Sequence, residues 1–192
     1  MIKLKKNIIV SLMGVDGSGK TTLAKKLNKT FKGSKYLHLK PYIFFPDRRT
    51  TVKNPHQQKK SSFFFSFLRL LSWLISYKIF FLQNRKNKIY IFDRYAHDVL
   101  IDPLRYKHAL FKNLTKYILN VFPNPDLWIF LNPPIKIIKN RKLELSDNEL
   151  RRQIKMYSFF FKGKKNVLRI NKNIQEEILT AKLTTSITSI IK

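Results

Sequence analysis

The sequence predicts an α/β domain of three layers, in which a five-stranded parallel sheet carries helices on both faces. Five short apolar runs alternate along the chain with longer segments of helical periodicity. A glycine-rich loop over residues 14–21 joins the first apolar run to the first helical segment. The chain has 192 residues, of which 44% are hydrophobic, so we expect a single domain over 1–192.

The loop that follows the first strand run, Ile8–Met13, fits the pattern G-x-x-x-x-G-K-[ST]. Its glycines allow the backbone to wrap tightly, so that its N–H groups can face phosphate oxygens at the positive end of the next helix. A lysine here is suited to reach the β- and γ-phosphates, and a threonine hydroxyl is suited to hold Mg²⁺. The loop therefore predicts an ATP site with Mg²⁺, formed by Gly14, Gly17, Ser18, Gly19, Lys20, Thr21 and Thr22.

The composition narrows the classes of partner. The net charge is +28, from 39 Lys and Arg against 11 Asp and Glu, but the lysines are spread along the chain. Nucleic-acid binding proteins concentrate such charge in a patch or a motif, so we expect no specific nucleic-acid partner.

The absence of cysteine excludes disulfides and thiolate metal sites. The basic residues 1–6 precede a single strand that ends in the loop, so we expect no signal peptide.

A second strand is predicted over Lys35–Lys40, with His38 on a polar face. Residues 41–62 are polar and contain prolines, and a loop this long is usually functional or disordered. The pair Arg48 and Arg49 is suited to grip a phosphate, because arginine binds phosphate in a bidentate way. A solvated loop is the equal alternative.

The most apolar segment, Phe63–Leu82, is long enough to span a membrane. Polar residues at helical spacing draw one stripe along it, at Ser66, Arg69, Ser72 and Ser76. We therefore expect no membrane span, but a helix buried on most sides with its polar stripe on a cleft. Packing against a partner subunit is a further alternative.

A third strand, Lys88–Phe92, ends at Asp93, Arg94 and Tyr95. Carboxyl ends of parallel strands form the ligand-binding edge of such sheets. Asp93 is suited to hold Mg²⁺ or to activate an acceptor, and Arg94 to bind the transferring phosphate; an ion pair that closes the strand is the alternative. Acids are scarce in this chain, so the grouping of Asp93 with Asp98 and Asp102 also indicates function.

The remaining segments continue the alternation of strands and helices. A mobile lid is predicted over 139–148, where Arg141 would bring positive charge over the phosphates; a basic surface turn is the alternative. A capping box at Ser146 and Glu149 begins the helix that follows the lid. The predicted segments are a polar loop over 96–106, helices over 107–121, 134–142, 146–161 and 174–191, and strands over 126–131 and 166–170.

Together these motifs resemble the thymidylate kinase family of nucleoside monophosphate kinases, over nearly the whole chain. The resemblance implies a P-loop kinase fold. It rests on the loop with Asp16 at its third position, Phe45-Pro46-Asp47-Arg48, Asp93-Arg94-Tyr95 and Pro125-Asp126-Leu127. It also implies that Asp16 contacts the sugar hydroxyl of the acceptor, that Arg48 binds the acceptor phosphate, and that Arg141 is the lid arginine. Arg94 and Tyr95 of the signature are expected at the substrate.

The expected reaction is transfer of the γ-phosphoryl group of ATP to a nucleoside monophosphate, which converts dTMP to dTDP. We expect the enzyme to act in nucleotide biosynthesis in the cytoplasm. The resemblance also implies a homodimer formed through the apolar helix. Two alternatives stay open. The first is a kinase of a hydroxyl acceptor, a nucleoside or a sugar, with Asp93 as base. The second is a non-catalytic nucleotide-binding protein linked to surface-polysaccharide functions, for which the high positive charge and the apolar segment Phe63–Leu82 are the motivation. The stretch Asp98–Tyr106 is similar to a branch of thymidylate kinase-like proteins linked to surface-polysaccharide genes.

Overall fold

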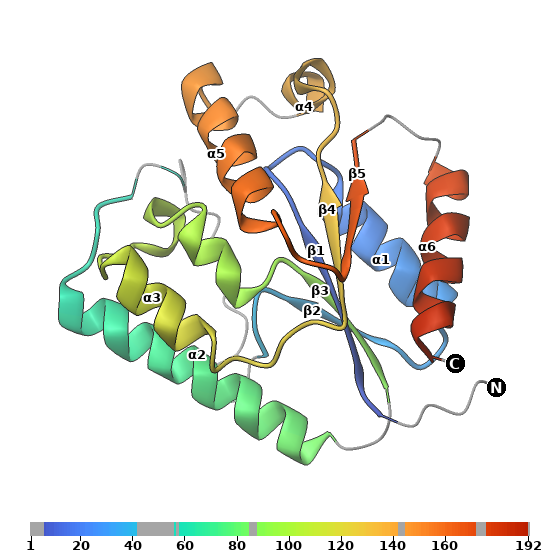
Figure 1. Ribbon diagram of the computed structural model, residues 1–192, viewed down its shortest axis with the longest axis horizontal. Helices are drawn as coiled ribbons and strands as arrows, with labels where there is room; N and C mark the ends of the chain where they lie inside the picture. The colour runs from blue at the N-terminus through green and yellow to red at the C-terminus, as the bar shows by residue number, and fades with distance from the viewer. Residues whose placement is uncertain are drawn as a thin grey trace. The chain divides into compact units, whose positions relative to one another are not determined.

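The computed structural model describes residues 6–41, 56, 58–84, 88–141, 145–171 and 176–191. The chain forms two compact units, whose helices and strands are labelled in Figure 1. The first unit consists of Met1–His38, Arg85–Tyr95 and Asn124–Lys192, and the second consists of Leu39–Asn84 and Ala96–Pro123. That the whole chain acts as one domain stays a prediction.

The first unit contains the predicted parallel sheet. Its strand order is β2-β3-β1-β4-β5, and each neighbouring pair is parallel. The predicted fold class, a three-layer P-loop kinase fold, is therefore confirmed. The strands are β1 (Ile8–Met13), β2 (Lys35–His38), β3 (Ile89–Asp93), β4 (Leu127–Leu131) and β5 (Val167–Ile170).

Helices cover both faces of this sheet. Ile8, Val10 and Leu12, at alternate positions of β1, face a core shared with α1 (Lys20–Thr30) and α6 (Glu176–Ile191). The opposite face is aromatic. Trp128 and Phe130 of β4 lie 5.8 and 5.1 Å, between ring centroids, from Phe161 at the end of α5 (Asp147–Phe160). The central strands are buried on both sides, which explains their continuous apolar sequences.

The register of the sheet brings two predicted motifs to one edge. Leu12 of β1 pairs with Asp93 of β3, and His38 of β2 pairs with the same aspartate. Because the strands are parallel, the glycine-rich loop after β1 and the carboxyl end of β3 lie at the same edge. This edge carries the candidate site.

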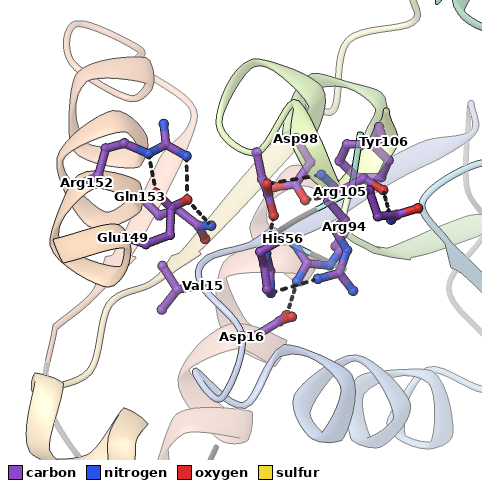
Figure 2. Close-up of polar contacts among 12 residues, drawn as sticks. Val15, Asp16, His56, Arg94, Asp98, Arg105, Tyr106, Glu149, Arg152 and Gln153 are labelled. Atoms are coloured by element: carbon purple, nitrogen blue, oxygen red, sulfur yellow. Dashed lines mark hydrogen bonds and ion pairs between the residues drawn. The ribbon is translucent and has the colours of Figure 1, made fainter. Parts of the chain in front are cut away.

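The segment after β4 holds α4 (Ile135–Arg141) and then α5. Ser146 caps α5, since its hydroxyl accepts a hydrogen bond of 3.4 Å from the Glu149 backbone N–H. The predicted start of this helix is confirmed. The Glu149 carboxylate accepts hydrogen bonds from Arg152 and Gln153, as Figure 2 shows.

The second unit is helical and differs from two sequence predictions. It contains α2 (Phe63–Gln83), the short 3-10 helices η2 (Ala96–Leu100) and η3 (Leu104–Tyr106), and α3 (Lys112–Leu119). The helix predicted over 107–121 is wrong in length, because Lys107 adopts a left-handed φ of 48° and ends η3. The polar loop predicted over 96–106 is also wrong, because η2 and η3 form there and bury His97, Asp98 and Asp102.

The helix α2 is oriented differently from the prediction. Ser72 of the predicted polar stripe is exposed, whereas Ser66 and Ser76 are buried beside Leu70, Trp73 and Tyr77. Their hydroxyls can be buried because each donates to a backbone carbonyl one turn earlier, at 3.0 and 2.8 Å. The expectation that the helix is buried on most sides is wrong. Its exposed side chains include Phe63, Phe64, Phe65, Phe67, Leu68, Leu71, Ile75 and Leu82.

Among the described residues, α2 is also the one helix long and apolar enough to cross a membrane, by length and composition alone. Core helices of soluble proteins meet the same criterion, so this finding is weak evidence by itself.

Candidate active site

The loop after β1 adopts a conformation that requires glycine. Gly14, Gly17 and Gly19 have φ values of 150°, 81° and 93°. A Cβ on Gly14 would stand 2.4 Å from the Leu131 carbonyl oxygen and 2.9 Å from the Ser18 hydroxyl. The chain closes tightly, with the Ser18 N–H donating to the Val15 carbonyl at 3.2 Å, and α1 begins directly afterwards. This is the predicted geometry of a phosphate-binding loop at a helix N-terminus.

Lys20 lies buried within the loop that precedes it. Its ammonium donates to the Val15 carbonyl oxygen at 2.6 Å and lies 3.8 Å from the Asp16 carboxylate. The charge is thus held at the place where the loop would receive a triphosphate. Ser18 is buried, whereas Thr21 and Thr22 are exposed at the start of α1.

Asp93 is the buried carboxylate of this site. Its Oδ2 accepts hydrogen bonds from the Thr21 hydroxyl at 2.6 Å and the Tyr36 hydroxyl at 3.0 Å. Burial by itself would raise the pKa of Asp93, but the neighbouring His38, the hydrogen bond from Thr21 and the charge of Lys20 hold it well below its usual value. The carboxylate is therefore ionised at neutral pH.

The other oxygen of Asp93 makes this a candidate cation site. Oδ1 is buried and accepts no hydrogen bond from the part of the chain that the structure describes. A buried carboxylate oxygen without a donor is costly unless a ligand satisfies it. Oxygen ligands of this kind, beside the Thr21 hydroxyl, fit Mg²⁺, which prefers carboxylate and hydroxyl oxygens. The described residues contain no cluster of three or more His, Cys, Asp or Glu that could hold a metal by themselves.

The aspartate of the loop and the arginine of the signature form an ion pair. Arg94 donates from Nη2 to the Asp16 carboxylate, and both side chains are nearly buried (Figure 2). Arg94 has a φ of 71°, which is unusual for a residue other than glycine, and its N–H donates to the Leu12 carbonyl at 3.0 Å. Such strain occurs mostly at functional sites.

Tyr95 is placed differently from its two neighbours in the signature. Its ring is fully buried and packs edge-on against Phe92 and Trp128, with centroids 5.0 and 5.5 Å away. Burial, and to a lesser degree the charge of Asp126, raises the pKa of Tyr95 well above its usual value. The structure does not bring this residue to the loop, so its contact with substrate stays a prediction.

Arg141 is the last residue of α4, and its side chain is exposed. Its Nη1 lies 3.4 Å from the point where a Cβ on Gly19 would stand, so the guanidinium is beside the loop. This places the predicted lid arginine next to the predicted phosphate site. Residues 142–144 of the lid segment lie outside the described residues, as does Arg48.

Two residues of β2 that the sequence did not assign to the site also lie there. Tyr36 and His38 alternate along β2 and both approach Asp93; His38 Nδ1 lies 3.5 Å from Oδ2. The alternation of residues along β2 predicts that Tyr36 and His38 lie on the same face of the strand. It does not predict that this face meets Asp93, because only the strand order places β2 beside β3.

The second unit contains a separate buried polar cluster, formed by His56 and side chains of residues 98–106. Asp102 pairs with His56 Nδ1 and accepts from the Arg105 backbone N–H at 3.2 Å. The Tyr106 hydroxyl donates to Asp98 at 2.7 Å (Figure 2). Asp98 and Asp102 are thus buried, and the function that their grouping indicates stays a prediction.

Solved structures of nucleotide and nucleoside kinases share this fold. Thymidylate kinase from Candida albicans superposes with a TM-score of 0.67 at 19% identity, over 96% of this chain and 92% of that one. Deoxyadenosine kinase from M. mycoides with bound dATP superposes with a TM-score of 0.60 at 18% identity, over 92% of this chain and 99% of that one. The YorR protein from Bacillus subtilis, in complex with phosphorylated GDP, superposes with a TM-score of 0.62 at 13% identity, over 94% of this chain and 95% of that one. At these identities the likeness establishes the fold.

No curated protein sequence matches the chain. The family model described as Thymidylate kinase matches residues 12–191, which include the glycine-rich loop, Asp93, Arg94 and Arg141.

Proposed function

We propose that this chain, which belongs to the thymidylate kinase family, transfers the γ-phosphoryl group of ATP to a nucleoside monophosphate. The proposed acceptor is dTMP, and the product is dTDP. One observation carries the proposal. The first unit assembles a buried lysine, an ionised aspartate and an aspartate–arginine pair around a phosphate-binding loop. We assign the donor functions to the lysine and the ionised aspartate, and the acceptor functions to the aspartate–arginine pair, all at one edge of one sheet.

Phosphoryl transfer is catalysed mainly by positioning and by neutralising charge. Lys20 would neutralise the β- and γ-phosphates, and Arg141 would add charge from the lid. The loop carries Gly17 rather than an arginine at its fourth position, so this second charge has to come from elsewhere. Bound at Thr21 and Asp93, Mg²⁺ would supply further positive charge to the phosphates of ATP.

The acceptor would be held by residues on the other side of the loop. Arg94 would bind its phosphate and Asp16 its sugar hydroxyl, which requires that the two side chains exchange their mutual ion pair for contacts with substrate. Arg48, outside the described residues, would bind the same phosphate. A monophosphate acceptor is already anionic and needs no strong general base.

The low pKa of Asp93 supports a nucleoside monophosphate as the acceptor, rather than the hydroxyl group of a nucleoside or a sugar. A general base works best when its pKa lies near the operating pH, and the pKa of Asp93 lies well below its usual value. A nucleoside or sugar kinase, with Asp93 as base, is therefore the second candidate. It is kept because deoxyadenosine kinase shares the fold. A non-catalytic nucleotide-binding protein is the third.

The deciding experiment is an acceptor screen with Mg·ATP that measures ADP release across deoxy- and ribonucleoside monophosphates, nucleosides and sugars. We expect turnover with monophosphates, dTMP foremost. Lys20→Ala should lower kcat at least about 100-fold while the circular dichroism spectrum is unchanged. Lys25→Ala, which removes an exposed lysine from the same helix, should not. Turnover of Lys20→Ala near the wild-type rate would contradict the kinase function.

Arg48→Ala separates the two kinase candidates. A monophosphate kinase should lose activity in this variant, whereas a kinase of nucleosides or sugars should keep it. ATP binding without turnover of any acceptor would instead favour the non-catalytic protein. We further propose a cytoplasmic homodimer that acts in nucleotide biosynthesis, with the exposed face of α2 as the subunit contact.

A further inference from the structure

The Asp93 carboxylate is held in an asymmetric way. Oδ2 accepts from two hydroxyls, Thr21 at 2.6 Å and Tyr36 at 3.0 Å, and His38 Nδ1 lies 3.5 Å from the same oxygen. Oδ1 has no hydrogen-bond partner among the described residues, although it is buried. The two oxygens of one carboxylate are therefore in different environments.

This asymmetry has a physical consequence for orientation. The terminal torsion of an aspartate side chain has a broad energy well, so an unrestrained carboxylate turns easily about its last bond. Donors on one oxygen restrict that rotation and fix which oxygen is left open. A metal ligand has to be fixed in this way, because groups around a site orient its ligands and their loss typically weakens metal binding.

From this geometry we propose that Tyr36 is a positioning residue for the nucleotide-bound cation. Its hydroxyl holds Asp93 Oδ2, so that Oδ1 stays directed to the cation. Thr21 is itself expected to hold the cation, so Tyr36 supplies a donor from outside the expected ligands. The identity of the cation as the Mg²⁺ of ATP rests on the proposed function.

The competing explanation is packing alone. The Tyr36 ring is partly buried and packs against the core formed by β1, α1 and α6. Tyr36→Phe keeps this ring and removes only the hydroxyl, so it separates the two explanations. Tyr117→Phe is the matched control, because it removes a hydroxyl from a ring that is 73% exposed on α3.

The primary measurement is binding of Mn²⁺ in the presence of ADP, followed by electron paramagnetic resonance, which requires no acceptor and no turnover. Loss of one hydrogen bond to a charged group should raise the Kd for Mn²⁺ about fivefold in Tyr36→Phe. Tyr117→Phe should bind as wild type. In turnover assays, Tyr36→Phe should raise the KM for Mg²⁺ by a similar factor and leave kcat at saturating Mg²⁺ nearly unchanged.

A double-mutant cycle tests whether Tyr36 acts through Asp93. In an Asp93→Asn background, Tyr36→Phe should produce no further change in Mn²⁺ affinity. An unchanged Kd in Tyr36→Phe, or an equal loss in both backgrounds, would overturn the inference. If no acceptor is turned over but Mn²⁺·ADP binding responds as described, the inference stands and the proposed reaction fails. Wild-type protein that binds no Mn²⁺·ADP would overturn both.

Discussion

Arg94 donates a hydrogen bond to the carboxylate of Asp16, a residue 78 positions earlier in the chain. The side chains are 5% and 10% exposed, so the pair is largely shielded from water. Removing one partner of a buried pair leaves an uncompensated charge, which usually costs more than the pair contributes. We therefore expect the loop aspartate and the arginine after β3 to be coupled in stability as well as in position.

A double-mutant cycle should reveal this coupling. Arg94→Ala is expected to lower the free energy of unfolding by about 3 kcal/mol, because the carboxylate of Asp16 loses its closest cation. The double variant Asp16→Asn/Arg94→Ala should lose clearly less than the sum of the two single variants. Urea titration followed by tryptophan fluorescence measures each value. Strict additivity would show that the pair carries no coupling energy.

Gly14 should be the least replaceable glycine of the loop. In Gly14→Ala the new Cβ would stand 2.4 Å from the Leu131 carbonyl oxygen, at a φ of 150°. We expect a loss of unfolding free energy of at least about 3 kcal/mol, because the clash is with backbone. Gly33→Ala is the control: it has a φ of 84° but nothing within 4 Å, so only conformational strain of about 1 kcal/mol is expected. Equal losses in the two variants would contradict the close approach.

His108 should make stability depend on pH. It is buried in the second unit, where Thr115 lies 2.7 Å from Nε2. Burial, with the charges of Arg69 and Lys60, lowers the pKa of His108 to about 4. In the unfolded chain an ordinary histidine has a pKa of about 6.5, so between these values the unfolded state binds more protons. This contribution to the free energy of unfolding is complete above pH 6.5 and is lost as pH falls toward 4.

The variant His108→Gln tests this dependence. Its free energy of unfolding should change less between pH 6.5 and 4 than that of the wild type, by an amount on the order of 2 kcal/mol. Asp93 interferes little, because its own contribution is lost only as pH falls from the unfolded pKa of an aspartate, about 3.9, toward its lower folded pKa. Denaturant titrations at several pH values measure the difference. Parallel pH curves for the two proteins would contradict the assignment to His108.

The exposed face of α2 should decide the oligomeric state. Phe64 and Phe65 are each 63% exposed, next to other apolar side chains of the same helix. If this face joins two subunits, the wild type should sediment at twice the chain mass of 22.9 kDa. Phe64→Lys should reduce the particle to one chain, because a buried lysine without a partner is costly. Phe159→Lys, at a residue 61% exposed on α5, is the control and should leave the mass unchanged.

Local signals predicted several features of the fold well. The apolar runs located all five strands, and the loop pattern located the turn at Gly14–Thr21. The serine cap located the start of α5. These signals depend on neighbours within a few residues, so the sequence contains them directly. The segment over 96–106 was mispredicted, because the acids that suggested a polar loop are satisfied by distant side chains, such as His56 for Asp102.

Local sequence patterns specify the phosphate-binding loop, its lysine and the strand that ends at Asp93. Each of these depends on residue types at fixed spacing. Which of these groups meet depends on the folded chain. Strand order places Tyr36 beside Asp93, and the fold of the second unit places His56 beside Asp102. Such contacts depend on how polar groups far apart in the chain satisfy one another once buried, which no local pattern encodes.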